Sequence, residues 1–255
     1  MKASWPMREA EELSIEDYKK RSRRSFLTGG AVAAAGFFTF RNIQSAELVD
    51  RAPGPLRDIH ELNESIWSSL FREDHLAKEY DISEASILRV NGRHGIRDEL
   101  DLASWQLNVL GPDGEQLGTH TLDDIKALPW HEMNIEHKCI EGWAQVTNWQ
   151  GARFSDFLAL YEDQLPDDIT DVYMETPDGD YYVSVDMATM RHPQTLLAYD
   201  NFGEPIRELN GAPLRLATPL KYGIKQIKRI GTIQFLRGQG GDYWGERGYD
   251  WYAGL

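Results

Sequence analysis

The chain contains a single cysteine, Cys139, within the stretch "HKCIEGW". One thiol cannot form an internal disulfide, so the hydrophobic core alone must stabilise the fold, even in an oxidising compartment. The sequence also lacks a C-x-x-C-H motif for covalent haem attachment and a C-x-x-C pair for zinc or an iron–sulfur cluster. The question is therefore what this protein does with one thiol.

An export signal is predicted near the start of the chain. Residues 22–27, "SRRSFL", place two arginines directly before an apolar run, which is typical of a twin-arginine signal. The run at 26–40 is rich in Gly and Ala and shorter than the ~20 residues of a membrane span. We predict that residues 1–45 are a signal segment and that the protein is periplasmic. The cleavage site is unclear, so the segment could persist as a membrane anchor; the alternative is a short buried helix.

The export route and the charge of the chain narrow the partners. The twin-arginine route carries folded proteins, often with a cofactor already inserted, so it hints at a bound cofactor. Residues 46–255 hold 19 basic and 36 acidic side chains, a formal charge of −17. This charge argues against nucleic acid or an anionic membrane surface as partner. About 210 residues suit one domain with its own core.

The hydrophobic pattern predicts an α+β fold with a mixed sheet, because short strands outnumber helices in an irregular order. Residues 46–85 are expected to form a helical surface layer and residues 86–255 the main domain. Strands are predicted at 104–110, 131–140, 195–199, 213–218 and 226–236, with a hairpin at 171–185. Helices are predicted at 59–70, 74–80, 121–128, which starts with a capping box, and 153–161.

Cys139 lies near the end of a predicted strand, where three roles compete. A free cysteine is usually a small buried hydrophobe. It could instead be a nucleophile with His137 or His192 as base. His137 is a poor base by position, because side chains two residues apart on a strand share a face but lie side by side. The third role is a soft-metal ligand, in which the metal would keep the thiolate deprotonated.

From residue 87 onward the chain resembles the sulfite-oxidase-like molybdopterin enzymes. Single segments are weak signals, but together and in the family's order they are specific. They are "RVNGRHG", "WQLNVLG", "TLDDIKALP", "CIEGWAQVTNWQGARFSDFL", "METPDGDYYVSV", "TLLAYDNFGEPIRELNGAPLRLATPLKYGIKQIKRI" and "GDYWGERGYDWYAG". The resemblance implies a sulfite-oxidase-type fold around one molybdenum and one pyranopterin.

The resemblance also implies a set of cofactor-binding residues. Cys139 would coordinate molybdenum and would be the catalytic residue. Arg215 would fork onto phosphate or pterin oxygens, while the 226–228 segment would offer backbone N–H groups and one ammonium. The complete implied set is Asn91, His94, Gly95, Cys139, Thr176, Asn210, Arg215, Gln226, Ile227 and Lys228.

Six further residues are candidates for the same site. Arg153 and Arg191 could supply a cationic wall, and Tyr181 and Tyr182 could line the pocket. Lys221 and Lys225 could belong either to the site or to a solvated strand face.

The resemblance implies oxygen-atom transfer on a small sulfur- or nitrogen-centred substrate, such as S-oxide reduction or sulfite oxidation. Asn210 and Thr176 match the branch that resembles the periplasmic methionine sulfoxide reductase. Electrons would come from or go to a separate cytochrome or membrane subunit. The chain ends soon after these motifs, which favours a monomeric catalytic subunit. The alternatives are a thiol hydrolase using Cys139 and a non-catalytic cofactor-binding scaffold.

Overall fold

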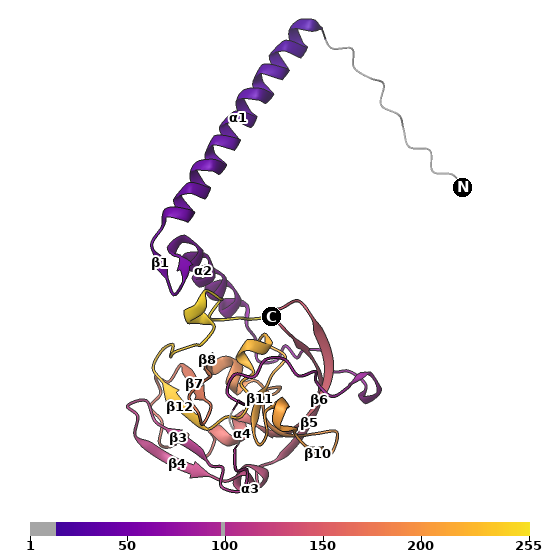
Figure 1. The fold of residues 1–255 in the computed structure, drawn as a ribbon, viewed down its shortest axis with the longest axis vertical. Coiled ribbons are helices and arrows are strands. Elements are labelled where there is room, and N and C mark those ends of the chain that lie inside the picture. Colours follow the sequence, from indigo (N-terminus) through magenta and orange to yellow (C-terminus); the bar gives the residue numbers. More distant parts are fainter. Residues whose placement is uncertain (1–13, 98–99) are drawn as a thin grey trace, which may run out of the picture.

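The computed structural model describes residues 14–97 and 100–255. Helix α1 (Ile15–Ser45) begins at Ser14, whose side chain accepts a hydrogen bond from the Asp17 amide. None of its residues is buried, and the helix extends away from the body of the protein (Figure 1). The predicted signal segment falls on this helix, except for residues 1–13, which lie outside the described residues. Within the described ranges, no helix combines the length and apolarity that crossing a bilayer requires.

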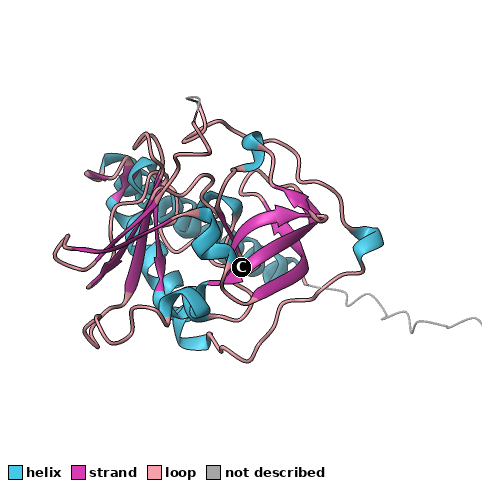
Figure 2. Cartoon of the chain, turned by 90° about the horizontal axis from the view of Figure 1, so that it is seen from below, coloured by secondary structure: helices cyan, strands magenta, loops and turns pink. Residues whose placement is uncertain are grey.

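Two five-stranded sheets form the body, and Figure 2 shows short helices packed between them. In the first sheet the order is β10-β9-β6-β5, with β11 also paired to β9; in the second it is β4-β3-β12-β7-β8. All named strand pairs are antiparallel except β3 with β12, which is parallel. The sheets are therefore mixed and the α+β prediction is confirmed.

The element bounds follow the sequence pattern closely. The strands are β1 (Leu48–Val49), β2 (Ala52–Pro53), β3 (Leu107–Leu110), β4 (Gln116–His120), β5 (Trp130–Lys138), β6 (Ala144–Arg153), β7 (Asp171–Glu175), β8 (Tyr182–Asp186), β9 (Leu196–Asn201), β10 (Glu204–Pro205), β11 (Arg215–Ala217) and β12 (Thr232–Leu236). The other α-helices are α2 (Gly54–Leu70), α3 (Leu122–Lys126), α4 (Phe154–Leu158) and α5 (Met187–Arg191). Four 3-10 turns complete the order: η1 (Ile82–Glu84), η2 (Glu208–Asn210), η3 (Gly223–Lys225) and η4 (Gly245–Arg247).

One core joins the two sheets. Phe157 of α4 and Met190 of α5 are fully buried with Val172 of β7 and Leu197 of β9. Each such side chain contributes roughly 1.5–3 kcal/mol through its removal from water. A second cluster around Trp149 of β6 packs on the other side of β6 and β9. Because β6 carries buried side chains on both faces, it forms a rigid base for the turn that begins at residue 139.

The predicted helix at 74–80 is wrong. The described backbone there is irregular, since its polar groups bond to the body instead of to each other. The Ala77 amide donates to the Gln194 side chain at 2.8 Å, and the Tyr80 amide donates to the Asn134 carbonyl of β5 at 2.9 Å. The strand predicted at 226–236 begins only at Thr232. Residues 226–231 are irregular, and η3 at residues 223–225 just before them places Gly223 and Ile224 in the cavity of Cys139.

Candidate active site

Cys139 follows the last residue of β5, at the point where the chain turns into β6. Its amide donates to the Trp143 carbonyl at 2.9 Å, and its carbonyl accepts from the Gly142 amide at 3.0 Å. Gly142 has a φ of +88°, which a residue with a side chain rarely adopts. The position predicted for Cys139, at a strand end, is confirmed, and the closed turn fixes the thiol in one place.

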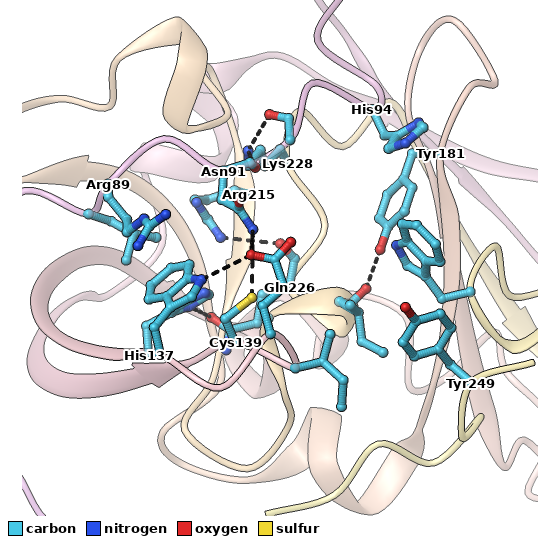
Figure 3. A pocket seen from close by; sticks show the side chains of 18 residues that line it. Arg89, Asn91, His94, His137, Cys139, Tyr181, Arg215, Gln226, Lys228 and Tyr249 are labelled. Carbon is cyan, nitrogen blue, oxygen red and sulfur yellow. Dashed lines mark hydrogen bonds between the residues drawn. The ribbon is translucent and has the colours of Figure 1, made fainter.

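The thiol lines a cavity of about 320 Å³. Cys139 is only 8% exposed, yet it is not sealed among aliphatic side chains. Ligand sites in proteins commonly enclose roughly 300–1,000 Å³. Figure 3 shows that the labelled residues divide between two sides of this space, with Arg215, Lys228 and Cys139 on one side and His94, Tyr181 and Tyr249 on the other.

The cations Arg215 and Lys228 lie on the thiol side, where Arg215 is buried and Lys228 is half-buried. The Arg215 guanidinium donates to the carbonyls of Asn210 at 2.7 Å and Gln226 at 3.2 Å, and it lies 4.5 Å from the centre of the Trp149 ring. The Lys228 ammonium donates to the Asn91 carbonyl at 2.6 Å. Among the ion pairs of the described ranges, neither group has a carboxylate partner.

Burial away from carboxylates lowers the pKa of both cations, although both remain charged at neutral pH. Burial lowers the pKa of Arg215 to about 9, and burial together with the nearby Arg215 charge lowers the pKa of Lys228 to about 8. An unpaired buried charge is costly, so these cations favour an anion in the cavity. The side chains thus suit a ligand with several negative charges.

His137 is buried beside the thiol but is not paired with it. Its Nδ1 lies 3.1 Å from the Gln226 amide oxygen, so Nδ1 carries the proton in that bond. Burial, followed by the Arg215 charge, lowers the pKa of His137 to about 3. The ring is therefore neutral and only weakly basic. No hydrogen bond between His137 and Cys139 occurs in the described part of the chain, and His192 lies away from this cavity, so neither histidine activates the thiol as a base would.

The side chains next to the thiol form a small polar network. The Asn91 amide donates to the Cys139 sulfur at 3.6 Å and to the Glu141 carboxylate at 3.2 Å. The Trp143 indole N–H also donates to Glu141, at 3.2 Å. Arg89 lies over the Trp143 ring, 4.6 Å from its centre. Glu141 and Trp143 stand in the "CIEGW" motif, but Arg89 could not be found from the sequence because only the fold brings it to the turn.

Aromatic rings form the opposite wall. His94 and Tyr181 stack with their ring centres 6.1 Å apart, and Trp244 meets Tyr249 edge to face at 5.1 Å. The Tyr181 hydroxyl donates to the Ile224 carbonyl of η3 (Figure 3). Burial raises the pKa of Tyr181 well above its ordinary value, so its hydroxyl keeps its proton. This wall is apolar apart from a few fixed polar atoms.

Six of the residues implied by the resemblance line the cavity together: Asn91, His94, Cys139, Arg215, Gln226 and Lys228. The backbone N–H groups of Gln226 and Ile227, expected to face the cofactor, instead donate to carbonyls of Gly223 and Lys225. In this segment the side chains of Gln226 and Lys228 therefore face the cavity, because η3 uses the amides for its own turn.

Four implied residues lie behind the cavity lining: Gly95, Thr176, Asn210 and Ile227. A Cβ on Gly95 would stand 2.2 Å from a Thr176 methyl, so these two residues pack directly against each other. The Asn210 amide donates to the Leu88 carbonyl at 2.8 Å, while its buried Oδ1 has no hydrogen-bond partner within the described chain. That orphaned oxygen lies in the residue whose carbonyl holds Arg215.

The other candidates are structural. Lys221 and Lys225 are buried in ion pairs with Asp186 at 2.7 Å and Asp242 at 2.5 Å. Arg153 and Arg191 do not line the cavity, so the expectation that they form a cationic wall is wrong. They are the last residues of β6 and α5, whereas Arg215 is the first residue of β11 and lines the cavity. Tyr182 is outside the cavity too, with its hydroxyl on a carboxylate of the C-terminal segment.

These features define a class of protein. Across the described ranges, no group of three or more His, Cys, Asp or Glu side chains is placed to hold a metal ion. A metal at Cys139 must therefore bring its remaining ligands with it, as part of a larger anionic group that Arg215 and Lys228 balance. The fold and site thus fit the class of domains that bind a large anionic cofactor through one thiol and a cationic wall.

The sequence pattern of the family described as "Oxidoreductase molybdopterin binding domain" matches residues 94–244, and the chain belongs to this family. The molybdenum–molybdopterin cofactor is confirmed at the level of the family, as is oxidoreductase activity. The residues present fit the group: a single thiol, a cavity of suitable size, the buried Arg215 and half-buried Lys228, neither of which has a carboxylate partner among the described residues, and the orphaned Asn210 oxygen.

Relatives and one solved structure extend the comparison. YedZ1 of Azospira oryzae, provisionally named a protein-methionine-sulfoxide reductase subunit, is 33% identical over 239 residues, 91% of this chain and 88% of the relative. The reductase catalytic subunit MsrP of Campylobacter jejuni is 32% identical over 157 residues, 55% of this chain and 52% of that protein. The chain thus spans about half the length of that subunit. The sulfane dehydrogenase SoxCD of Paracoccus pantotrophus shares the fold, with a TM-score of 0.50 at 20% identity over 56% of this chain and 40% of its own.

Proposed function

We propose that this protein reduces a sulfoxide by oxygen-atom transfer, with Cys139 as the protein ligand of molybdenum. The observation that carries the proposal is the division of the cavity into a cationic side, which holds the thiol, and an aromatic side without a cation of the Lys or Arg type. The names of the relatives YedZ1 and MsrP point to the same substrate class.

The two walls favour a neutral substrate over sulfite. Sulfite is an anion and would require a cation of its own. In this proposal Arg215 and Lys228 balance the cofactor's charge, and Arg89, the other Lys or Arg of the lining, stacks on Trp143 on the thiol side and not on the aromatic side. The thioether product packs well against aromatic rings, with sulfur about 5 Å from the ring, and a neutral sulfoxide needs no counterion there. His94, Tyr181, Trp244 and Tyr249 offer that surface.

The balance of the reaction assigns work to the chain. When bound, the cofactor supplies a centre that accepts an oxygen atom and exchanges two electrons. The sulfur–oxygen bond of the substrate breaks, the sulfur is reduced to a thioether, and the oxygen ends as water with two protons and two electrons from a donor protein. The Lys228 ammonium, with a pKa of about 8, holds a proton at neutral pH within the cavity. Neutral His137 and Gln226 hold the turn around the thiol in place.

The electron donor is, in this proposal, a separate cytochrome or membrane subunit. The protein itself would act in the periplasm, delivered folded by the twin-arginine segment, whose arginines lie exposed on α1. It would be a monomeric catalytic subunit that takes methionine-sulfoxide-type substrates.

The test uses protein matured in a host that makes the molybdenum cofactor. We expect one molybdenum and one pterin per chain, and reduction of methionine sulfoxide with an artificial electron donor. Cys139→Ser should keep the fold and lose activity. Sulfite oxidation faster than sulfoxide reduction would overturn the assigned direction. A metal-free protein whose Cys139 reacts rapidly with iodoacetamide would favour a thiol hydrolase instead.

A further inference from the structure

Helix α2 turns its polar side toward the body of the protein and its apolar side toward the solvent. Its apolar side chains are 38–63% exposed: Leu56, Ile59, Leu62, Ile66, Trp67 and Leu70. Its polar residues Arg57, His60, Glu61 and Glu64 instead line an inner cavity together with residues 239–251. A surface helix normally buries its apolar side. The inward polar side must therefore make contacts that hold this helix in place.

Arg57 makes most of these contacts. Its guanidinium donates to four backbone carbonyls: Nε to Val49 at 3.1 Å, Nη2 to Asp50 at 2.7 Å and to Gly245 at 2.5 Å, and Nη1 to Tyr249 at 2.7 Å. Two of these acceptors lie in the β1–β2 hairpin, and two lie nearly 190 residues later in the chain. A planar guanidinium can hold such a set at once, whereas an ammonium cannot.

The hairpin under Arg57 is strained. Its two turn residues, Asp50 and Arg51, both have positive φ, 46° and 63°. A two-residue turn of this kind normally carries Gly at its second position, and a bulky residue there costs about 1–3 kcal/mol. Arg57 holds the carbonyls at the start of this turn, which keeps the hairpin against Gly248, whose Cβ position lies 3.7 Å from the Arg51 carbonyl.

The second pair of acceptors belongs to the aromatic wall of the catalytic cavity. Gly245 begins η4 directly after Trp244, and both Trp244 and Tyr249 line the cavity that holds Cys139. Arg57 itself does not reach that cavity. It does hold the segment on both sides of η4, so the ring positions depend on it.

We propose that Arg57 is a positioning residue for the substrate: it fixes Trp244 and Tyr249 from outside the cavity, so that the layer at residues 46–70 completes the aromatic wall. The inference rests on the proposed function, because it assigns that wall to the substrate. It extends that function to α2, a helix that does not line the cavity of Cys139.

The experiment compares the full-length, molybdenum-loaded protein with Arg57→Gln and Arg57→Lys. The first readout is hydrogen exchange of the amides at 246–249, which bond within the segment to carbonyls of Asp242, Trp244 and Gly245. We expect at least about tenfold faster exchange in Arg57→Gln, an effect equal to ~1.4 kcal/mol. We expect a KM for methionine sulfoxide raised about tenfold, kcat changed less than about threefold and full molybdenum content. Arg57→Lys should recover part of both effects.

The matched control is Arg72→Gln, which removes an exposed arginine two residues after α2 that is paired with exposed Asp74. It should change neither readout. Unchanged exchange at 246–249 in Arg57→Gln would overturn the proposal, as would equal losses in kcat and kcat/KM with an unchanged KM. If the wild-type protein reduces no sulfoxide, the proposed function fails, while the exchange measurement still decides whether Arg57 holds the segment. If Arg57→Gln does not fold, Arg57→Lys supplies the same comparison.

Discussion

Arg215 and Trp149 form the support of the cofactor side: the guanidinium lies 4.5 Å from the centre of a fully buried indole ring. The ring stabilises the cation by cation–π attraction but cannot neutralise it. Within the described chain, the guanidinium donates its hydrogen bonds to backbone carbonyls, those of Asn210, Gln226 and the neighbouring Leu216. The pair thus keeps a positive charge ready for an anionic ligand.

Arg215→Lys should lower the molybdenum content of the purified protein by about tenfold or more, because an ammonium cannot reach both carbonyls and present a fork to an anion. Elemental analysis of protein from a cofactor-producing host measures the effect. Arg191→Lys, at an exposed site paired with Glu162, is the control and should bind molybdenum normally. Full occupancy in Arg215→Lys would contradict the role given to this cation.

The buried His137 should make the cofactor-free protein less stable as the pH falls. Its folded pKa is about 3, whereas its ordinary value is 6.5, so below 6.5 the unfolded chain binds a proton that the folded protein does not. Above pH 6.5 the free energy of unfolding does not depend on the titration of His137. Below pH 6.5 it decreases as the pH is lowered, by about 2 kcal/mol at roughly pH 5. Urea unfolding of wild type and His137→Gln at several pH values measures it. Equal slopes in the two proteins would refute the prediction.

Lys228 should change its titration when the cofactor binds. In the cavity without a ligand its pKa is about 8, lowered chiefly by burial and then by Arg215. An anion in the cavity raises the pKa of a neighbouring ammonium, so the group should remain charged to higher pH in the loaded protein. NMR of isotopically labelled lysine side chains can follow this. A pKa that is the same with and without cofactor would show that Lys228 does not face the anion.

Gly151→Ala should destabilise the fold without touching the cavity. A Cβ at this position of β6 would stand 2.2 Å from the Leu197 carbonyl of β9, so the two strands would have to separate. We expect a loss of about 1–3 kcal/mol in the free energy of unfolding. Thermal denaturation measures it, with Gly114→Ala as a control for a glycine whose Cβ meets open space but whose positive φ resists alanine. A larger loss at Gly114 than at Gly151 would place backbone conformation above strand spacing.

The sequence located most strands because alternation of apolar residues reports one buried face, which is a local property. It misassigned residues 74–80, since charged segments near Asp74 can be helical alone but here bond to Gln194 and β5. It placed Cys139 at a strand end for the same local reason. The resemblance to a known family supplied the distant residues, of which Asn91, Arg215 and Lys228 meet around the thiol.

The sequence alone places a single thiol near the end of a strand, indicates an α+β fold with a mixed sheet, and carries the resemblance to a known family. Which Lys and Arg side chains pair with carboxylates depends on the tertiary structure. Lys221 and Lys225 form ion pairs with Asp186 and Asp242. Among the described residues, Arg215 and Lys228 have no such partner. The tertiary structure also brings Arg89 to the thiol side of the cavity, and it brings Arg57 to the segment that carries Trp244 and Tyr249. The reason is physical: the pairing of a charge depends on distance in space, and strand order in the sheets sets that distance for residues far apart in the chain.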